Sequence, residues 1–295
     1  MEALSILIPV YNWDCSRLIE DLSAQARVLG IPYEIVIADD CSTDIHILER
    51  NRECAGSTEN CRFFALGRNM GRSAIRNFLA DKSKYDKLLF LDCDAAVRDD
   101  QFIRRYVDAA DKASVVCGGA VHSDEIPEKG VELRWVYEKN ADKERSARFR
   151  SRNPYARFTP FSFLIDRALF MRIRFDESYA HYGYEDVQFG CELERMGVSI
   201  LHIDNQLIHL GLEKSEVYLE KTRQAVQNAF AHKDEVEGGS RLLTHYNRVV
   251  RFRMRWLFRG LWKLFGKQME KNLLGSTPSL RIFSLYKLCY ICILK

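Results

Sequence analysis

Short runs of apolar residues alternate with amphipathic segments along the first half of the chain. The runs predict strands at residues 4–10, 33–38, 62–66, 87–91 and 114–120. The segments between them predict helices that end near residue 29, extend from 42 to about 53, and cover 73–80. Strands that alternate with helices in this way are typical of βαβ units and a mainly parallel sheet.

The second half of the chain shows a weaker pattern. Helical spacing predicts helices at residues 131–149, 167–172, 185–196 and 216–233, and apolar runs predict strands at 161–165 and 198–203. A Glu-Gly-Gly-Ser segment at 237–240 is expected to form a hinge. The whole pattern favours an α/β fold, with a Rossmann-like, mixed and mainly parallel sheet flanked by helices and followed by a C-terminal helical extension.

Composition excludes several classes of protein. The 295 residues are 47% hydrophobic and 29% charged, which excludes a disordered, collagen-like or disulfide-scaffold chain. No apolar run reaches the ~20 residues that cross a bilayer, so a polytopic membrane protein is excluded. The odd number of cysteines, nine, indicates reduced thiols in a cytosolic protein. Cys289 and Cys292 are interpreted as packing residues, and the N-terminus does not resemble a signal peptide.

Positive charge is concentrated in the C-terminal tail. Residues 241–295 contain twelve Lys or Arg and a single acid, Glu270, whereas the remainder has 32 basic and 40 acidic residues. Between residues 248 and 267 apolar side chains recur at helical spacing, and arginines repeat every four residues at Arg251, Arg255 and Arg259. This pattern predicts a basic amphipathic helix on an anionic membrane surface. The alternative is that this helix and the apolar segment 280–294 pack on the enzyme or on another subunit.

Carboxylates follow two of the predicted strands. Asp39 and Asp40 end one strand, and Asp92 and Asp94 end another. In an open parallel sheet, ligands bind beyond the carboxyl ends of the strands. Oxygen ligands of this kind suit Mg²⁺ or Mn²⁺, which commonly also hold substrate phosphates. The alternative is that these acids only form turns and helix caps.

Five motifs, in order over about residues 4–210, resemble those of the family 2 glycosyltransferases, which have the type-A nucleotide-sugar fold. They are Ile6-Leu7-Ile8-Pro9-Val10-Tyr11-Asn12, Ala38-Asp39-Asp40-Cys41-Ser42-Thr43-Asp44, Asn69-Met70-Gly71 with Arg76-Asn77, Leu91-Asp92-Cys93-Asp94-Ala95, and Gly183-Tyr184-Glu185-Asp186. Cys41 departs from the usual glycine of the second motif, and a left-handed turn is harder for cysteine.

The resemblance implies a binding site for a nucleotide-sugar donor. Its donor-binding residues would be Pro9, Tyr11, Asp39, Asp40, Asn69, Arg76 and Asp92. Pro9, Tyr11 and Asp39 would hold a uracil ring, and Asp92 would face the ribose and the sugar. Arg76 would contact phosphate or bond the acidic loop. Asp94 would ligate Mn²⁺ or Mg²⁺, and His209 either completes that metal site or is a satisfied histidine.

The resemblance also assigns the catalytic residues. Asp186 would be the catalytic base, with Glu185 beside it near the acceptor. A helix N-terminus keeps such a carboxylate ionised, although acids in a first helical turn also simply complement the helix dipole. His181 and Tyr182 are candidates for acceptor contact, and His202 is expected to be structural. The six basic residues of 143–157 are interpreted as a solvated face, or alternatively as a mobile loop over an anionic ligand.

Together these features predict a metal-dependent, inverting hexosyltransferase. Residues 1–122 would bind the nucleotide sugar and 123–236 the acceptor. Residues 237–295 would form a basic amphipathic helical tail, of which 241–295 would bind an anionic membrane surface. The acceptor would be a saccharide or lipid-linked glycan in surface polysaccharide synthesis, and the enzyme would be cytoplasmic, at the inner face of the cytoplasmic membrane. Nucleic acid is not an expected partner. The alternatives are a retaining transferase, a nucleotidyltransferase, and an inactive sugar-nucleotide-binding subunit.

Overall fold

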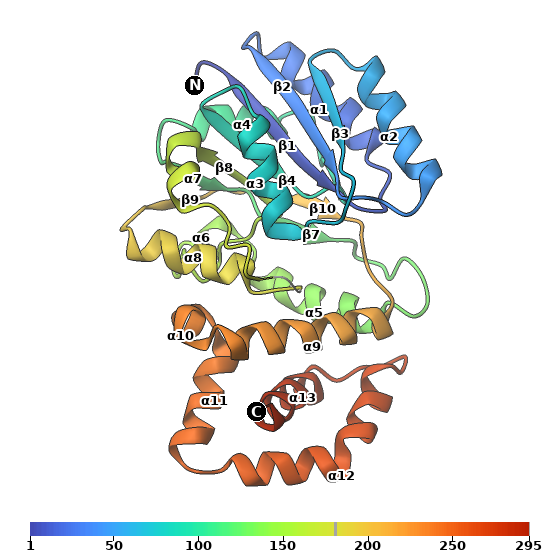
Figure 1. Cartoon of the computed structure of the whole chain (residues 1–295), viewed down its shortest axis with the longest axis vertical. Coiled ribbons are helices and arrows are strands. Elements are labelled where there is room, and N and C mark those ends of the chain that lie inside the picture. Colours follow the sequence, from blue (N-terminus) through green and yellow to red (C-terminus); the bar gives the residue numbers. More distant parts are fainter. Residues whose placement is uncertain (180–181, 295) are drawn as a thin grey trace.

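The computed structural model describes residues 1–179 and 182–294, so His181 lies outside the described residues. Its centre is a seven-stranded sheet with the order β3-β2-β1-β4-β8-β6-β9 (Figure 1). The strands are β1 Leu4–Val10, β2 Tyr33–Asp39, β3 Cys61–Ala65, β4 Lys87–Leu91, β6 Val115–Cys117, β8 Ser162–Asp166 and β9 Ile200–His202. Only β8 runs antiparallel to its neighbours, β4 and β6. The expected mixed, mainly parallel sheet is confirmed.

Helices cover both faces of this sheet (Figure 1). One face packs against α1 (Ser16–Val28), α2 (Ile45–Ser57) and α4 (Phe102–Ala109), and the other against α3 (Arg72–Lys82), α7 (Arg167–Ile173) and α8 (Glu185–Arg195). Successive side chains of a strand point to opposite faces, so β1 supplies both cores. Leu4, Ile6 and Ile8 enter the first core, and Leu7 enters the second.

A second, three-stranded sheet consists of β5 (Ala95–Ala96), β10 (Leu207–His209) and β7 (Ala120–His122). The single strand predicted over 114–120 is wrong, because it divides into β6 and β7, which belong to different sheets. Gly119 lies at this division with φ of +87°, a conformation that favours glycine. In the small sheet, β10 pairs His209 with both Ala95 and His122. Asp94, which precedes β5, is therefore brought next to His209.

Two predicted helices are interrupted. The helix expected over 131–149 ends early as α5 (Glu132–Ala141), and a 3₁₀ turn and the short α6 (Ala147–Arg150) follow it. The helix expected over 248–267 is two helices, α11 (Arg241–Arg251) and α12 (Arg255–Leu273). Arg253 adopts φ of +57° in the turn between them. Apolar spacing continues across this turn, so periodicity alone did not indicate the break.

The C-terminal helices pack on the body of the protein. Helix α13 (Leu280–Ile293) lies among α9 (Ser215–Ala231), α11 and α12, and the short α10 (Lys233–Val236) links α9 to α11 (Figure 1). Cys289 and Cys292 are buried on α13, and all nine cysteines are free, which confirms their interpretation as packing residues. Among the described residues, no helix combines the length and apolar character needed to span a bilayer.

Two arginines of the expected membrane-facing stripe bind the protein instead. Arg255 and Arg259 each donate a hydrogen bond to the carbonyl oxygen of Cys292, at 3.2 and 2.8 Å, and Arg255 also bonds that of Leu294 at 2.9 Å. These carbonyls lie at the C-terminal end of α13, where the helix dipole favours a cation. Not all arginines of this row are therefore available to a membrane surface, because Arg255 and Arg259 hold α13 in place.

Candidate active site

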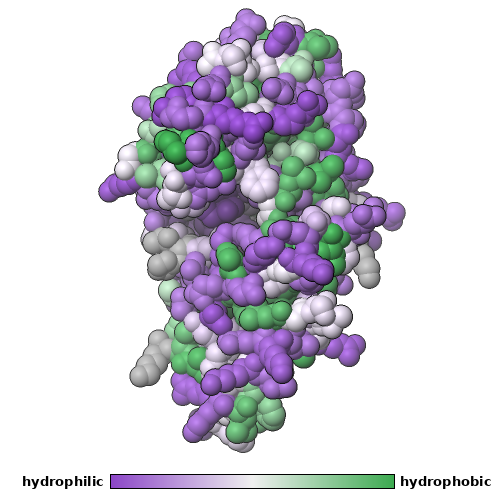
Figure 2. Space-filling model, turned by 90° about the vertical axis from the view of Figure 1, so that its right-hand side faces the viewer, coloured by the Kyte–Doolittle hydropathy of each residue, from purple (hydrophilic) through white to green (hydrophobic). Residues whose placement is uncertain are grey.

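The carboxyl ends of β2 and β4 open onto two adjoining cavities. The N-terminal cavity, of about 680 Å³, is lined by residues that include Pro9, Tyr11, Asp40, Asn69 and Arg76. The C-terminal cavity, of about 540 Å³, is lined by residues that include Tyr137, Tyr182, Glu185, Asp186 and His209. Arg72, Asp92 and Asp94 line both cavities, so the two meet at these side chains. Figure 2 shows a hollow lined by hydrophilic residues between the upper and lower parts of the molecule.

Of the predicted donor-binding residues, all except Asp39 line the N-terminal cavity. Asp39 is 1% exposed. Its two carboxylate oxygens accept hydrogen bonds from the backbone N–H and the hydroxyl of Ser42, at 2.7 and 2.6 Å. Between them, Cys41 adopts the left-handed conformation that the family's glycine would favour, with φ of +63°. The contact of Asp39 with uracil stays a prediction, because these bonds direct its carboxylate into the loop.

Asp40 organises the loop that carries Asn69. Its carboxylate accepts hydrogen bonds from the backbone N–H groups of Met70 and Gly71, at 2.6 and 3.0 Å. The Asn69 side-chain amide donates in turn to the Asp40 carbonyl oxygen at 3.0 Å. These bonds join the second and third sequence motifs, which are about thirty residues apart, and place both on the wall of the N-terminal cavity.

Two arginines of α3 connect the remaining motifs. The buried Arg76 lies 2.5 Å from one Asp92 oxygen, and Arg72 lies 3.4 Å from the other. The Arg72 Nε also lies 2.8 Å from a carboxylate oxygen of Glu185, 113 positions later in the chain. Arg72 was not among the predicted site residues. Its spacing of four residues from Arg76 puts both arginines on one face of α3, and this spacing is the sequence signal that could have indicated it. Arg72 therefore ties Asp92 to the motif that carries Asp186.

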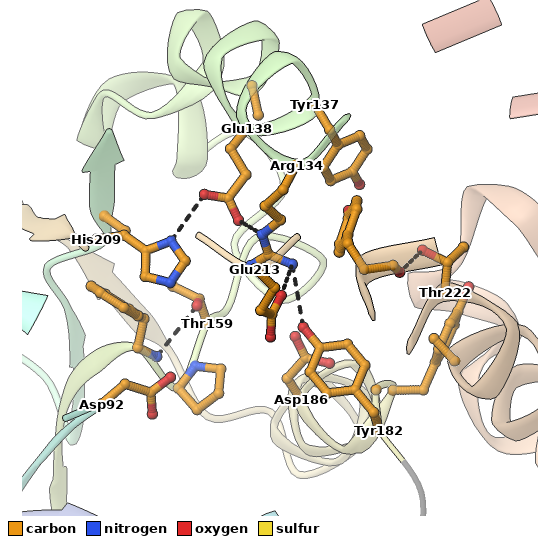
Figure 3. A pocket seen from close by; sticks show the side chains of 18 of the residues that line it. Asp92, Arg134, Tyr137, Glu138, Thr159, Tyr182, Asp186, His209, Glu213 and Thr222 are labelled. Atoms are coloured by element: carbon orange, nitrogen blue, oxygen red, sulfur yellow. Dashed lines mark hydrogen bonds and ion pairs between the residues drawn. The ribbon is translucent and has the colours of Figure 1, made fainter. Parts of the chain in front are cut away.

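Asp186 lies at the N-terminus of α8 and lines the C-terminal cavity (Figure 3). Burial raises its pKa to about 6, and repulsion from Glu185 adds to that effect, whereas the Val187 N–H and Arg72 act in the opposite direction. Within the described part of the chain, no Lys, Arg or His forms an ion pair with Asp186. A carboxylate with this pKa and without a counter-ion can accept a proton near neutral pH.

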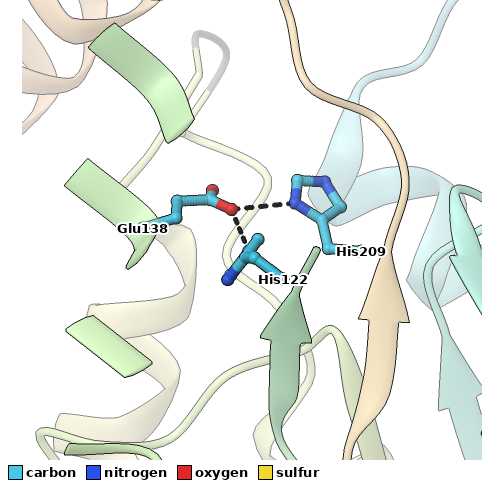
Figure 4. Close-up of side chains that lie close together, drawn as sticks. All are labelled: His122, Glu138 and His209. Carbon is cyan, nitrogen blue, oxygen red and sulfur yellow. Dashed lines mark hydrogen bonds and ion pairs between the residues drawn. The ribbon is translucent and has the colours of Figure 1, made fainter. Parts of the chain in front are cut away.

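The predicted metal ligands lie together at the small sheet. His209 Nε2 lies 3.0 Å from an Asp94 carboxylate oxygen, and its Nδ1 lies 3.0 Å from one of Glu138 on α5 (Figure 4). The same Glu138 oxygen contacts His122 Nε2. His122, Glu138 and His209 form a cluster in which all three residues are buried. An imidazole nitrogen and a carboxylate oxygen suit Mn²⁺, and a carboxylate on the other ring nitrogen is the usual support of a ligating histidine. The donor set therefore fits a divalent cation.

Glu138 and His122 were not predicted as site residues, because neither belongs to a sequence motif. Burial alone would lower the pKa of His209, but hydrogen bonds to Asp94 and Glu138 raise it to about 9. Burial would likewise raise the pKa of Glu138, but its hydrogen bonds to His122 and His209 hold that pKa well below the usual range of a glutamate. A cation that binds His209 must displace this proton, so binding weakens as pH falls.

Gly211 controls the position of Asp94. A Cβ atom at residue 211 would lie 2.1 Å from the Asp94 carboxylate, so any larger residue must displace that side chain. Gly211→Ala is expected to weaken Mn²⁺ binding by roughly ten- to a hundredfold, as when groups that orient metal ligands are disturbed. Calorimetric titration with Mn²⁺ measures this effect. Gly56→Ala is the control, because a Cβ there meets nothing within 4 Å. Equal affinities of the two variants would contradict the prediction.

Other sequence predictions have structural outcomes. His202 is buried and lies 2.7 Å from Arg150 and 3.1 Å from the Pro154 carbonyl oxygen, which confirms its structural role.

The solvated-face interpretation of residues 143–157 is wrong for Arg150, which is 4% exposed. It donates hydrogen bonds to four carbonyl oxygens, those of Cys117, Gly118, Arg145 and Ile203. The sequence alone does not distinguish such an arginine from a solvated one.

Known proteins share this sequence pattern and fold. The sequence model of glycosyl transferase family 2 matches residues 5–178. The chain is 25% identical to the chondroitin synthase of Escherichia coli over 262 residues, which cover 71% of this chain and 34% of that protein. It therefore spans about a third of the length of that relative.

Solved structures resemble the chain in fold at low sequence identity. The mannosyltransferase PcManGT from Pyrobaculum calidifontis, in complex with GDP-Man and Mn²⁺, has a TM-score of 0.58 and 14% identity, covering 98% of this chain and 85% of its own. TarS of S. aureus has a TM-score of 0.50 and 18% identity, covering 80% and 42%. The family match includes more than half of the chain, and Glu185, Asp186 and His209 lie beyond it. The chain belongs to glycosyl transferase family 2.

Proposed function

We propose that the protein transfers a sugar from a nucleotide sugar, with UDP as its nucleotide, to a hydroxyl group of a saccharide acceptor. The observation that carries this proposal is the junction of the two cavities at Asp92 and Asp94. The residues predicted to bind the donor, except Asp39, line one cavity, and Asp186 lines the other. Residues 1–122 would thus hold the donor and residues 123–236 the acceptor.

The arrangement of side chains supports direct displacement. Asp186 accepts the proton of the acceptor hydroxyl while its oxygen bonds to the anomeric carbon. The bond between that carbon and the diphosphate oxygen breaks on the opposite side, so the configuration is inverted. Mn²⁺ or Mg²⁺ at Asp94 and His209 would offset negative charge on the departing diphosphate. Arg72 lies 2.8 Å from Glu185, whereas no cation among the described residues forms an ion pair with Asp186.

The proposal is tested by a panel of donors. UDP-sugars and GDP-mannose are incubated with the protein, Mn²⁺ and simple glycoside acceptors, and nucleoside triphosphates are incubated in parallel with a sugar phosphate. Free nucleotide, pyrophosphate and product are measured. Release of UDP with a product of inverted anomeric configuration by NMR is the expected result. A product of retained configuration would reject the inverting mechanism, and release of pyrophosphate from nucleoside triphosphates would favour a nucleotidyltransferase. GDP-mannose is included because PcManGT is solved with it.

We further propose that α12 contacts an anionic membrane surface, which would place the enzyme at the inner face of the cytoplasmic membrane beside a lipid-linked glycan acceptor. Trp256 and Leu264 are 73% and 75% exposed, and their spacing of eight residues puts them within about 80° of each other around α12. The exposed Lys263 and Lys267 lie on the same helix, and hydrophobic side chains reach the surface at this end of the molecule (Figure 2). Apolar side chains flanked by lysines on one helix match a bilayer with anionic headgroups.

Trp256→Glu is expected to weaken binding to phosphatidylglycerol vesicles by about tenfold or more, because burial of such a side chain contributes roughly 1.5–3 kcal/mol. Co-sedimentation measures this binding. Val28→Glu is the matched control, because Val28 is 84% exposed on α1, far from α12 (Figure 1). If wild type does not bind vesicles, or if both variants bind as wild type does, the membrane proposal is wrong.

A further inference from the structure

The C-terminal extension forms part of the wall of the C-terminal cavity. Phe283 and Lys287 of α13 line this cavity together with Asp186, but they do not line the N-terminal cavity. Phe283 belongs to a buried cluster that joins α13 to α5 and α9. The part of the chain that sequence analysis assigned to a membrane surface thus also contacts the region proposed for the acceptor.

Lys287 differs from the other Lys and Arg residues of this cavity. Arg72 pairs with Asp92 and Glu185, Arg134 with Glu138 and Glu213, and Arg145 with Asp142. Over residues 1–179 and 182–294, by contrast, no carboxylate lies within ion-pair distance of the Lys287 ammonium group. The cavity therefore contains one cation whose charge the protein itself does not neutralise.

Aromatic rings surround this ammonium group. Its nitrogen lies 4.4 Å from the ring centroid of Phe283 and 5.2 Å from that of Tyr137. Cation–π contacts of this kind compensate part of the cost of burying a charge. Burial lowers the pKa of Lys287 to about 8, which still leaves most of the population charged at neutral pH. An anion that entered the cavity would supply the missing partner.

We propose that Lys287, Tyr137 and Phe283 form a subsite for an anionic group of the acceptor saccharide, either a carboxylate or a phosphate. This inference rests on the proposed function, because it requires the acceptor to occupy the C-terminal cavity. The ammonium group pairs with the anion, and the ring of Tyr137, which is 40% exposed, offers an apolar face to a sugar ring, while the buried Phe283 supports the ammonium group. The subsite would select acidic saccharides over neutral ones of the same shape.

Three aryl glycosides test this subsite as acceptors. They are p-nitrophenyl β-D-glucoside, the corresponding glucuronide, and the corresponding glucoside 6-phosphate. Each is titrated calorimetrically into wild-type protein that is saturated with UDP and Mn²⁺. We expect at least one of the two anionic probes to bind about tenfold or more tightly than the glucoside. The better of the two identifies the anion as carboxylate or phosphate. Equal binding of all three probes would overturn the inference.

Three variants test whether the charge of Lys287, rather than its packing, causes the preference for the anionic probe. Lys287→Gln is expected to remove the preference for the anionic probe, and Lys287→Arg to retain most of it. Lys112→Gln, at an exposed turn outside both cavities, is expected to retain it fully. Retention of the preference in Lys287→Gln would overturn the inference.

Binding of UDP with Mn²⁺ serves as the fold control for each variant, since it uses the other cavity. It also distinguishes the two proposals. If wild type does not bind UDP or any other nucleotide, the proposed function fails. If UDP binds but the anionic probes have no advantage, only the acceptor subsite is wrong.

Discussion

Asp186→Asn is expected to lower kcat by roughly a hundred- to ten-thousandfold, the range for loss of a general base. Asparagine has nearly the same shape as aspartate but does not accept the proton of the acceptor hydroxyl. Binding of UDP and Mn²⁺ should stay unchanged, because Asp186 lines only the C-terminal cavity. Steady-state kinetics and calorimetry measure the two quantities. Asp108→Asn, on the exposed side of α4, is the matched control.

The pH profile provides a second test of the same residue. The pKa of Asp186 is raised to about 6, so the carboxylate is protonated, and inactive as a base, below that pH. With Mn²⁺ kept saturating at every pH, so that protonation of His209 does not limit metal binding, we therefore expect kcat/KM to rise about tenfold per pH unit up to pH 6 and then to level off. A profile that stays flat between pH 4.5 and about 7, or an Asp186→Asn variant with full activity, would show that another group is the base.

Asp94→Ala is expected to abolish the dependence of UDP binding on Mn²⁺. The Asp94 carboxylate is 3.0 Å from His209 Nε2, so its removal leaves one of the two predicted ligands. We expect Mn²⁺ affinity to fall by about a hundredfold or more, because ligation requires the oxygen that alanine lacks. Electron paramagnetic resonance of free Mn²⁺ measures the affinity directly.

Two further variants test which carboxylates contribute to Mn²⁺ affinity. Glu138→Gln should reduce Mn²⁺ affinity by a smaller factor, because Glu138 supports the His209 ring through Nδ1 at 3.0 Å. Asp108→Ala should leave affinity unchanged, since Asp108 lies on the exposed side of α4. If Asp94→Ala binds Mn²⁺ as wild type does, the cation is held elsewhere, and the cluster of His122, Glu138 and His209 becomes the next candidate.

The amino-acid sequence by itself predicted most strands of the large sheet and the places where the candidate carboxylates follow them. The strand expected at residues 87–91 is β4 without change, and that at 4–10 is β1. Buried parallel strands are continuous apolar runs, and this is a local signal. Acids that follow such strands lie at one edge of the sheet, so Asp40, Asp92 and Asp94 were found from their positions alone.

Tertiary structure alone decided how these residues are paired. Arg72 and Glu185 are 113 positions apart, and Glu138 and His209 are 71 apart. Lys287 lines a cavity with Asp186 although it lies in a different predicted segment. Helical and strand periodicity report only which face of an element is apolar, and not which element covers that face. The counter-ions, the support of His209 and the Lys287 cation of the C-terminal cavity depend on contacts between distant segments, which form only when the chain folds.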